Sequence, residues 1–254
     1  MSAAGGDLEA ARQGLRGLAG LAGSPVLDAR LRRAAHLWPL KAAPGLDEPG
    51  WAALLDATTV QETQLFRAPA QLVALDAGLP PLAGAARAAE RPLRLLSAGC
   101  ATGEEAFSLA AIGLGLALPG LAVEVVGLDI CRPALAAAEA GLIGAHLGAP
   151  LALVPARHLP WLAGADGAPR LHPALRRLLR FQRCNLLELS HGLGLFDAIL
   201  CRNVLIYMET DARRVVLDGL LRLLRPHGLL GLGATDAAPG PPLTQIGQAL
   251  YRHG

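Results

Sequence analysis

The stretch Leu93–Phe107 reads L-R-L-L-S-A-G-C-A-T-G-E-E-A-F and contains the strongest indication of the fold. Its apolar start predicts a short strand, and the small residues after it predict a tight loop that includes Gly99 and Gly103. Two glutamates and an Ala/Leu-rich run then predict a helix. A strand that leads through such a loop into a helix lets backbone amides approach a nucleotide-like ligand closely.

A second apolar run, Val123–Leu128, ends at Asp129. This places a carboxylate at the tip of the next parallel strand, where it can accept hydrogen bonds from the two hydroxyls of a ribose. The glycine loop alone is compatible with NAD, a flavin or S-adenosylmethionine, or with a turn that binds nothing. Asp129 favours a ribose-bearing ligand.

Apolar strand-like runs and helical patterns alternate along the rest of the chain. Alternation of this kind predicts an α/β fold, with a doubly wound, mostly parallel sheet covered by helices on both faces. We expect strands at 93–97, 122–128, 179–184, 196–201 and 228–233, and helices at 104–117, 132–140 and 210–224.

Two regions depart from this alternation of strands and helices. Residues 1–57 contain apolar residues at helical spacing between Pro and Gly breakers, which predicts a small N-terminal helical region ahead of a main domain at 58–254. Residues 144–180 are rich in Pro and Gly, and we interpret them as a short inserted subdomain.

The composition is that of a globular protein, since 52% of the 254 residues are hydrophobic and 17% are charged. A net charge of +2 does not suggest nucleic-acid binding. The four cysteines stand singly, so we expect neither a metal site nor disulfides, and no signal peptide is apparent. The uncharged run 106–123 is broken by Pro119 and Gly120, which argues against membrane insertion. A cytoplasmic protein fits these features.

Polar residues follow the apolar run 196–201, among them Arg202, Asn203 and Tyr207. Because ligands of open α/β sheets bind outside the carboxyl ends of the strands, these side chains should face the same crevice as the 97–103 loop. The segment 58–67 precedes the core domain, where it can cover that pocket.

Four blocks of this sequence resemble the CheR-type chemotaxis-receptor glutamate O-methyltransferases. E-T-Q-L-F-R at 62–67 is similar to the family's N-x-T-x-F-F-R, and S-A-G-C-A-T-G-E-E at 97–105 to its S-A-G-C-S-T-G-E-E. N-L-L at 185–187 and C-R-N-V-L-I-Y at 201–207 are similar to its N-L-L and C-R-N-V-x-I-Y. The resemblance covers about residues 58–254, and the last block is the most specific.

The resemblance implies a Rossmann-like methyltransferase that uses S-adenosylmethionine as its cofactor. The implied reaction is methyl transfer to glutamate side chains in the cytoplasmic helical region of a chemoreceptor. Neither the receptor nor the oligomeric state follows from the resemblance.

Residue roles also follow from the resemblance alone. It implies that Arg67 and Tyr207 lie at the transferred methyl group and the acceptor carboxylate. The residues implied to contact the cofactor are Gln61, Thr63, Arg67, Gly99, Gly103, Glu105, Asp129, Asn185, Leu186, Arg202 and Asn203. Gln61 stands where the family usually has asparagine.

Two other interpretations remain open. The substitution at Gln61 and the short N-terminal region are compatible with a catalytically weak cofactor-binding module that has a regulatory role in a sensory array. The glycine loop alone is compatible with a nicotinamide-dependent oxidoreductase, although the 201–207 block has no task in such an enzyme.

Overall fold

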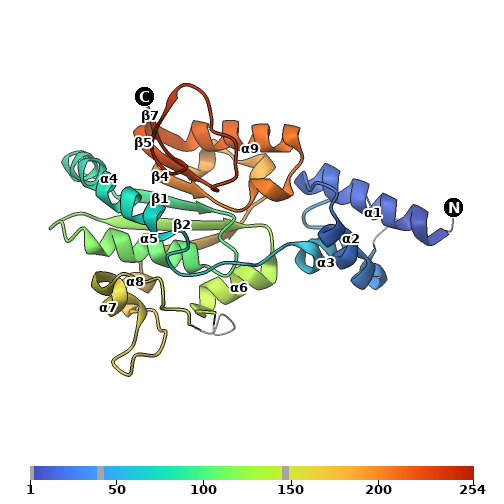
Figure 1. Ribbon diagram of the computed structural model, residues 1–254, viewed down its shortest axis with the longest axis horizontal. Helices are drawn as coiled ribbons and strands as arrows, with labels where there is room; N and C mark the ends of the chain where they lie inside the picture. Colours follow the sequence, from blue (N-terminus) through green and yellow to red (C-terminus); the bar gives the residue numbers. More distant parts are fainter. Residues whose placement is uncertain (1–2, 39–42, 145–148) are drawn as a thin grey trace.

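The computed structural model describes residues 3–38, 43–144 and 149–254 (Figure 1). Within this part of the chain, seven strands form one sheet in the order β3-β2-β1-β4-β5-β7-β6. All neighbours are parallel except β7, which pairs antiparallel with β5 and β6. The strands are β1 (Leu93–Ala98), β2 (Val123–Asp129), β3 (Leu179–Arg183), β4 (Phe196–Cys201), β5 (Leu224–Leu232), β6 (Leu243–Gly247) and β7 (Leu250–His253).

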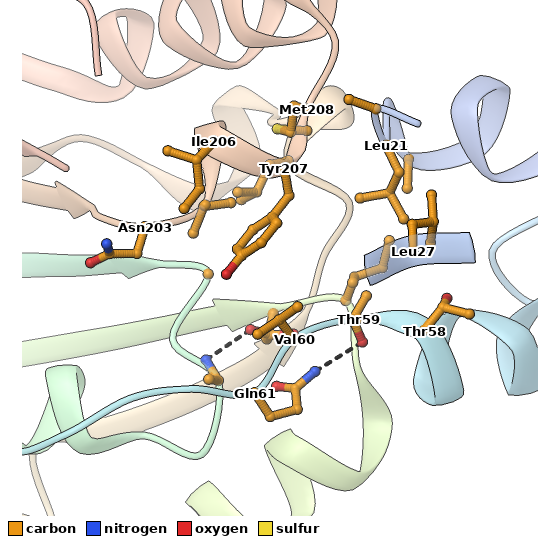
Figure 2. A pocket seen from close by; sticks show the side chains of 18 of the residues that line it. Leu21, Leu27, Thr58, Thr59, Val60, Gln61, Asn203, Ile206, Tyr207 and Met208 are labelled. Atoms are coloured by element: carbon orange, nitrogen blue, oxygen red, sulfur yellow. Dashed lines mark hydrogen bonds between the residues drawn. The ribbon is translucent and has the colours of Figure 1, made fainter. Parts of the chain in front are cut away.

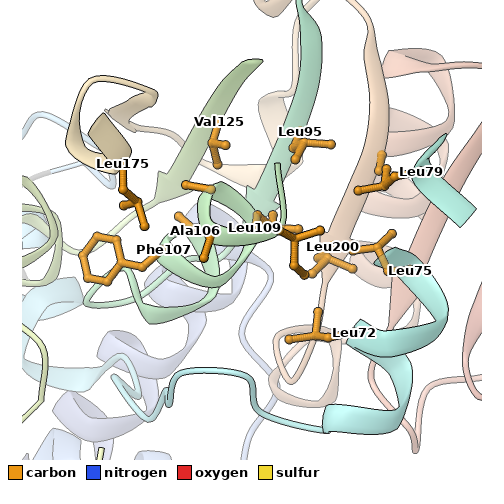
Figure 3. Close-up of a cluster of buried hydrophobic side chains, with 14 of the residues drawn as sticks. Leu72, Leu75, Leu79, Leu95, Ala106, Phe107, Leu109, Val125, Leu175 and Leu200 are labelled. Atoms are coloured by element: carbon orange, nitrogen blue, oxygen red, sulfur yellow. The ribbon is translucent and has the colours of Figure 1, made fainter. Parts of the chain in front are cut away.

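Two apolar clusters lie on opposite faces of the sheet. One packs α4 (Pro69–Ala88) and α5 (Glu104–Gly115) against strand residues such as Leu95 and Leu200 (Figure 3). The other packs α9 (Thr210–Leu223) against strand residues such as Leu96 and Leu230. The remaining core helix, α6 (Arg132–Ala140), packs against β2 and β3. The predicted doubly wound, mostly parallel fold is therefore confirmed.

The expected strands and helices of the core match the observed ones within a few residues, except at β5. This strand begins at Leu224 instead of residue 228, because Leu224 pairs with Phe196 ahead of an irregular stretch. In that stretch His227 has φ of +63°, and regular pairing resumes at Leu229. The run 106–123 divides between α5, a loop and β2. No helix in the described residues is long and apolar enough to cross a membrane.

The N-terminal helices are α1 (Ala3–Ala19), α2 (Pro25–Arg33) and α3 (Pro49–Thr58), and they share a small apolar core that includes Trp51. The start of α2 follows from sequence, because the Ser24 side chain accepts a hydrogen bond from Leu27 N–H and Pro25 occupies the first turn. Figure 1 shows these helices beside the sheet, at one end of the molecule.

The chain after α1 is bonded to the segment that follows β4. Ala22 N–H donates to the Tyr207 carbonyl and Glu209 N–H donates to the Gly20 carbonyl, each at 2.8 Å. Leu21 and Met208 form the β-bridge between these two bonds. The N-terminal helices are therefore fixed directly to the segment that contains Tyr207.

The predicted inserted subdomain contains two single-turn helices, α7 (Leu159–Leu162) and α8 (Pro173–Arg176). An isolated bridge joins Ala163 to Pro169. Its residues 145–148 lie outside the described part of the chain, as do residues 1–2 and 39–42 of the predicted N-terminal region. The division into 1–57 and 58–254 stays a prediction.

Candidate functional site

A cavity of about 530 Å³ lies at the carboxyl ends of β1, β2 and β4 (Figure 2). This volume is within the roughly 300–1,000 Å³ typical of small-molecule sites. Residues from the glycine loop and strand ends form one side, and residues 19–30 of the N-terminal region form the other. The segment 58–62 completes the wall between them.

The loop after β1 can follow its path only because glycines stand at two positions. Gly99 has φ of +81°, and a Cβ atom there would lie 2.3 Å from Cγ2 of Val204. Gly103 has φ of +98°, and a Cβ atom there would lie 2.7 Å from the Phe107 ring. Side chains at either position would clash as well as strain the backbone. Gly99 lines the cavity, whereas Gly103 sets the start of α5.

Asp129, at the end of β2, presents a buried carboxylate to the cavity. Its Oδ2 accepts a hydrogen bond from Ala101 N–H at 2.8 Å, and its Oδ1 accepts one from Cys131 N–H at 2.9 Å. Burial raises the pKa of Asp129, and the backbone donors partly oppose that rise. Each carboxylate oxygen can accept two hydrogen bonds, so capacity remains for the two hydroxyls of a ribose.

Gln61 belongs to the segment 58–62 that completes the cavity wall. Its Nε2 donates to Thr59 Oγ1 at 2.9 Å (Figure 2). Its Oε1 is buried and has no hydrogen-bond partner among the described residues. A buried amide oxygen without a partner is costly, so a donor from a bound ligand, such as an ammonium group, would stabilise it. The acceptor oxygens of Asp129 and Gln61 in this one cavity therefore fit the hydroxyl and ammonium donors of S-adenosylmethionine.

Arg202 connects three segments at the cavity wall, and its side chain is only 4% exposed. Its Nε donates to Glu105 Oε2 at 2.6 Å, and its Nη1 donates to the Arg67 carbonyl at 2.6 Å. Glu105 Oε1 in turn accepts a hydrogen bond from Ser97 Oγ at 2.7 Å. This buried ion pair holds the end of β4, the start of α5 and the 58–67 segment in one arrangement.

Gln71, which the sequence analysis did not single out, extends this network. Its Oε1 accepts a hydrogen bond from Arg202 Nη1 at 3.2 Å. Its Nε2 donates to the Leu232 carbonyl at 3.0 Å and to the Ala249 carbonyl at 2.7 Å. Through Gln71, helix α4 ties the site to the turn between β6 and β7.

The structure brings most of the sequence-predicted site residues to the cavity wall, namely Gln61, Gly99, Asp129, Asn185, Leu186, Arg202, Asn203 and Tyr207. The wall, as the described residues form it, does not include Thr63, Arg67, Gly103 or Glu105. The guanidinium of Arg67 instead donates from Nη1 to the Glu62 carbonyl at 2.9 Å.

Tyr207 extends its ring into the cavity toward Val60 and Gln61 (Figure 2). Asn185 is buried at the start of a short 3-10 turn, and its Nδ2 donates to the Leu18 carbonyl at 2.8 Å. Asn203 has φ of +58°, in the left-handed region. These residues, which follow β3 and β4, add polar groups to the cavity wall that the glycine loop also lines.

The cavity wall also contains residues that the sequence analysis missed. Leu21, Val26 and Leu27 form an apolar side, and Arg30 and Arg213 add two cations. Of these residues, only Arg213 could have been suspected from its place in the sequence, because it falls in the first turn of the helix that follows Tyr207. The approach of residues 21–30 to this edge of the sheet depends on tertiary packing.

Asp236, after β5, provides a pH-dependent test of this edge. Burial raises its pKa, although the Gly233 N–H bond and the charge of Arg213 oppose the rise. The folded state therefore binds a proton at Asp236 more readily than the unfolded state does. Wild-type stability falls as the pH rises above the ordinary pKa of aspartate, which is about 3.9. Because asparagine cannot ionise, the stability of Asp236→Asn minus that of wild type should increase between about pH 4 and about pH 7. Urea denaturation across this range measures it, and a decreasing difference would contradict the assignment.

An open sheet in this order, with a glycine turn after β1 and a carboxylate ending β2, is the architecture of Rossmann-like S-adenosylmethionine-dependent methyltransferases. The model of the family described as CheR methyltransferase, SAM binding domain, matches residues 61–245. The chain therefore belongs to the CheR methyltransferase family, and its cofactor is S-adenosylmethionine.

Curated relatives agree with this assignment. The chain is 35% identical over 195 residues to the probable biofilm formation methyltransferase WspC of Pseudomonas putida, covering 73% of this chain and 44% of WspC. It is 35% identical over 194 residues to chemotaxis protein methyltransferase 1 of Vibrio cholerae, covering 74% of this chain and 69% of that protein.

Among solved structures, Rickettsia typhi PKMT2 in complex with AdoHcy is 15% identical. The alignment covers 54% of this chain and 20% of that one, with a TM-score of 0.37. A likeness at this level does not bear on function.

Proposed function

We propose that this protein transfers the methyl group of S-adenosylmethionine to a glutamate side-chain carboxylate of a chemoreceptor-like protein. The observation that carries the proposal is one cavity lined by both the carboxylate of Asp129 and the hydroxyl-bearing ring of Tyr207. The names of the curated relatives support methyl transfer with a role in chemotaxis or in biofilm formation.

The proposed reaction needs little chemistry from the protein. A carboxylate oxygen of the acceptor forms a bond to the methyl carbon, while the bond from that carbon to sulfur breaks and its electron pair stays on sulfur. Glutamate has an ordinary pKa of about 4.3, so the acceptor is ionised at neutral pH and needs no general base. Positioning the two reactants can supply roughly 7–11 kcal/mol of the barrier reduction.

We assign the cavity residues to two groups. Asp129 would accept hydrogen bonds from the ribose, Gln61 from the ammonium group, and Asn185 and Leu186 would border the adenine. Tyr207 would donate a hydrogen bond to the acceptor carboxylate.

The buried pair of Arg202 and Glu105 would act by fixing the cavity walls. Arg67 would act in part through its carbonyl, which Arg202 already binds.

A methyl-transfer assay with labelled cofactor tests the proposal. Receptor fragments should acquire base-labile methyl esters, and Tyr207→Phe should lower kcat about 10- to 100-fold, the effect of losing a hydrogen bond to a charged group. The affinity for S-adenosylhomocysteine should stay unchanged in this variant. Folded, cofactor-loaded protein that forms no base-labile ester on any receptor fragment would reject the proposal.

One observation favours a second function, a regulatory module that binds the cofactor without turnover. The guanidinium of Arg67, expected at the transferred methyl group, lies outside the cavity wall and bonds to the Glu62 carbonyl. Calorimetry that shows cofactor binding, together with zero turnover on receptors from both chemotaxis and biofilm pathways, would support this second function.

A further inference from the structure

We propose that Arg213 binds the carboxylate of the methyl acceptor, and that this contact selects an anionic side chain. The inference rests on the proposed function and names the residue that gives it acceptor specificity. Arg213 belongs to none of the sequence blocks that carried the family resemblance.

The position of Arg213 relative to Tyr207 is fixed by the backbone. Arg213 lies in the first turn of α9, and its Nε donates to the Met208 carbonyl at 2.8 Å. Met208 directly follows Tyr207, and all three residues line the cavity. The guanidinium is thereby held beside the segment whose tyrosine ring enters the cavity.

The remaining donors of Arg213 are available to a ligand. A guanidinium has five N–H donors, in a planar arrangement that matches a carboxylate. Only the Nε donor of Arg213 has an acceptor among the described residues. No carboxylate in the described part of the chain lies within ion-pair distance of Arg213.

The other two cavity arginines are engaged differently. Arg202 is paired with Glu105 and donates to two further oxygens, so its charge is already compensated. Arg30 donates from Nη1 to the Thr59 carbonyl, on the side of the cavity formed by residues 58–62. Arg213 is the cavity cation that combines proximity to Tyr207 with unused donors.

The acidic groups around the cavity do not neutralise this cation by contact. Glu62 and Asp129 line the wall, and Asp129 already accepts hydrogen bonds from the backbone amides of Ala101 and Cys131. Asp236 senses the charge of Arg213, but its hydrogen bond is to Gly233 N–H and its buried Oδ1 has no partner among the described residues. An incoming carboxylate would therefore meet an arginine that still has its charge and most of its donors.

A binding experiment with S-adenosylhomocysteine-loaded protein tests the inference without requiring turnover. Two alanine-rich helical peptides are compared, one with a single central glutamate and the other with glutamine in its place. Wild type should prefer the glutamate peptide, and Arg213→Gln should weaken its binding about 10- to 100-fold and remove the preference. Arg213→Lys should restore part of the preference, because lysine keeps the positive charge but lacks the planar guanidinium that can bond both carboxylate oxygens.

Arg214→Gln is the matched control, since Arg214 is the next residue of the same helix, is largely exposed and, among the described residues, pairs only with Asp211. It should bind both peptides as wild type does. A glutamate preference that survives in Arg213→Gln, or that is lost in Arg30→Gln instead, overturns the inference. So does wild-type protein that binds the two peptides equally or binds neither.

Methylation of the glutamate peptide is measured separately. An Arg213-dependent preference without any methyl transfer would reject the proposed function while supporting the carboxylate subsite. Methyl transfer that is unaffected in Arg213→Gln at limiting peptide concentration would reject the subsite while supporting the proposed function.

Discussion

Replacing Asp129 with asparagine is expected to weaken the binding of S-adenosylhomocysteine by a factor of at least about 100. The carboxylate would accept two ribose hydroxyl bonds, and each hydrogen bond to a charged group contributes about 1.5–3 kcal/mol. Asparagine removes the charge and turns one acceptor into a donor, which would also face a backbone N–H of Ala101 or Cys131. Isothermal titration calorimetry measures the change.

Asp56→Asn is the matched control for this variant. Asp56 also accepts a hydrogen bond from a backbone amide, Arg132 N–H at 2.9 Å, but it does not line the cavity. Its replacement should leave cofactor affinity unchanged. Equal affinity of Asp129→Asn and Asp56→Asn would show that Asp129 does not bind the ribose.

Replacing Arg202 with methionine is expected to lower the free energy of unfolding by about 3–5 kcal/mol, the usual effect of breaking a buried ion pair. Methionine fills much of the same volume but leaves the buried Glu105 carboxylate without its cation. It also deprives the Arg67 carbonyl and Gln71 Oε1 of their donor. Equilibrium denaturation in urea measures this loss.

The double variant Arg202→Met/Glu105→Gln separates two contributions to the lost stability, the unpaired charge of Glu105 and the changed packing around residue 202. If the unpaired carboxylate causes most of the loss, neutralising it should recover a large part of the stability. Arg214→Met breaks an exposed pair and should change stability by no more than about 1 kcal/mol. A single Arg202→Met variant as stable as Arg214→Met would show that the buried pair is not stabilising the site.

The core strands could be predicted because their signal is local. Val123–Asp129 and Phe196–Cys201 are apolar runs that end at polar residues, as expected for strands covered on both faces. The same ends carry Asp129 and Arg202, so the edge of the sheet at which the site lies also followed from sequence. Short segments of the sequence were therefore enough to predict the strands of the core and the edge of the sheet at which the site lies.

Helix α4 was not predicted, because Pro80 and Pro81 stand in its interior, where proline is strongly unfavourable. Its buried residues Leu72, Leu75 and Leu79 nevertheless repeat at helical spacing, and they pack into the larger apolar cluster of the sheet (Figure 3). This burial offsets the cost of the prolines. The periodicity was a usable signal that the breakers obscured.

The parts of the site that sequence did not reveal depend on contacts between distant segments. Gln71 bonds to carbonyls of Leu232 and Ala249, which no local pattern connects to it. Arg213 reaches the cavity because α9 begins directly after the tyrosine segment. The family motif placed Arg67 near the methyl group, whereas in the structure the Glu62 carbonyl holds its guanidinium outside the cavity wall.

Ala22 bonds to Tyr207, and Gly20 bonds to Glu209. These bonds link two equilibria, the binding of a ligand in the cavity and the attachment of the N-terminal helices to the sheet domain. Residues 19–30 supply one wall of the cavity, so a ligand bound there contacts both the N-terminal helices and the sheet domain. Ligand occupancy must then oppose detachment of those helices, by an amount that grows with the logarithm of ligand concentration. Amide hydrogen exchange in the first two helices should consequently slow as the site fills, although neither helix belongs to the sheet.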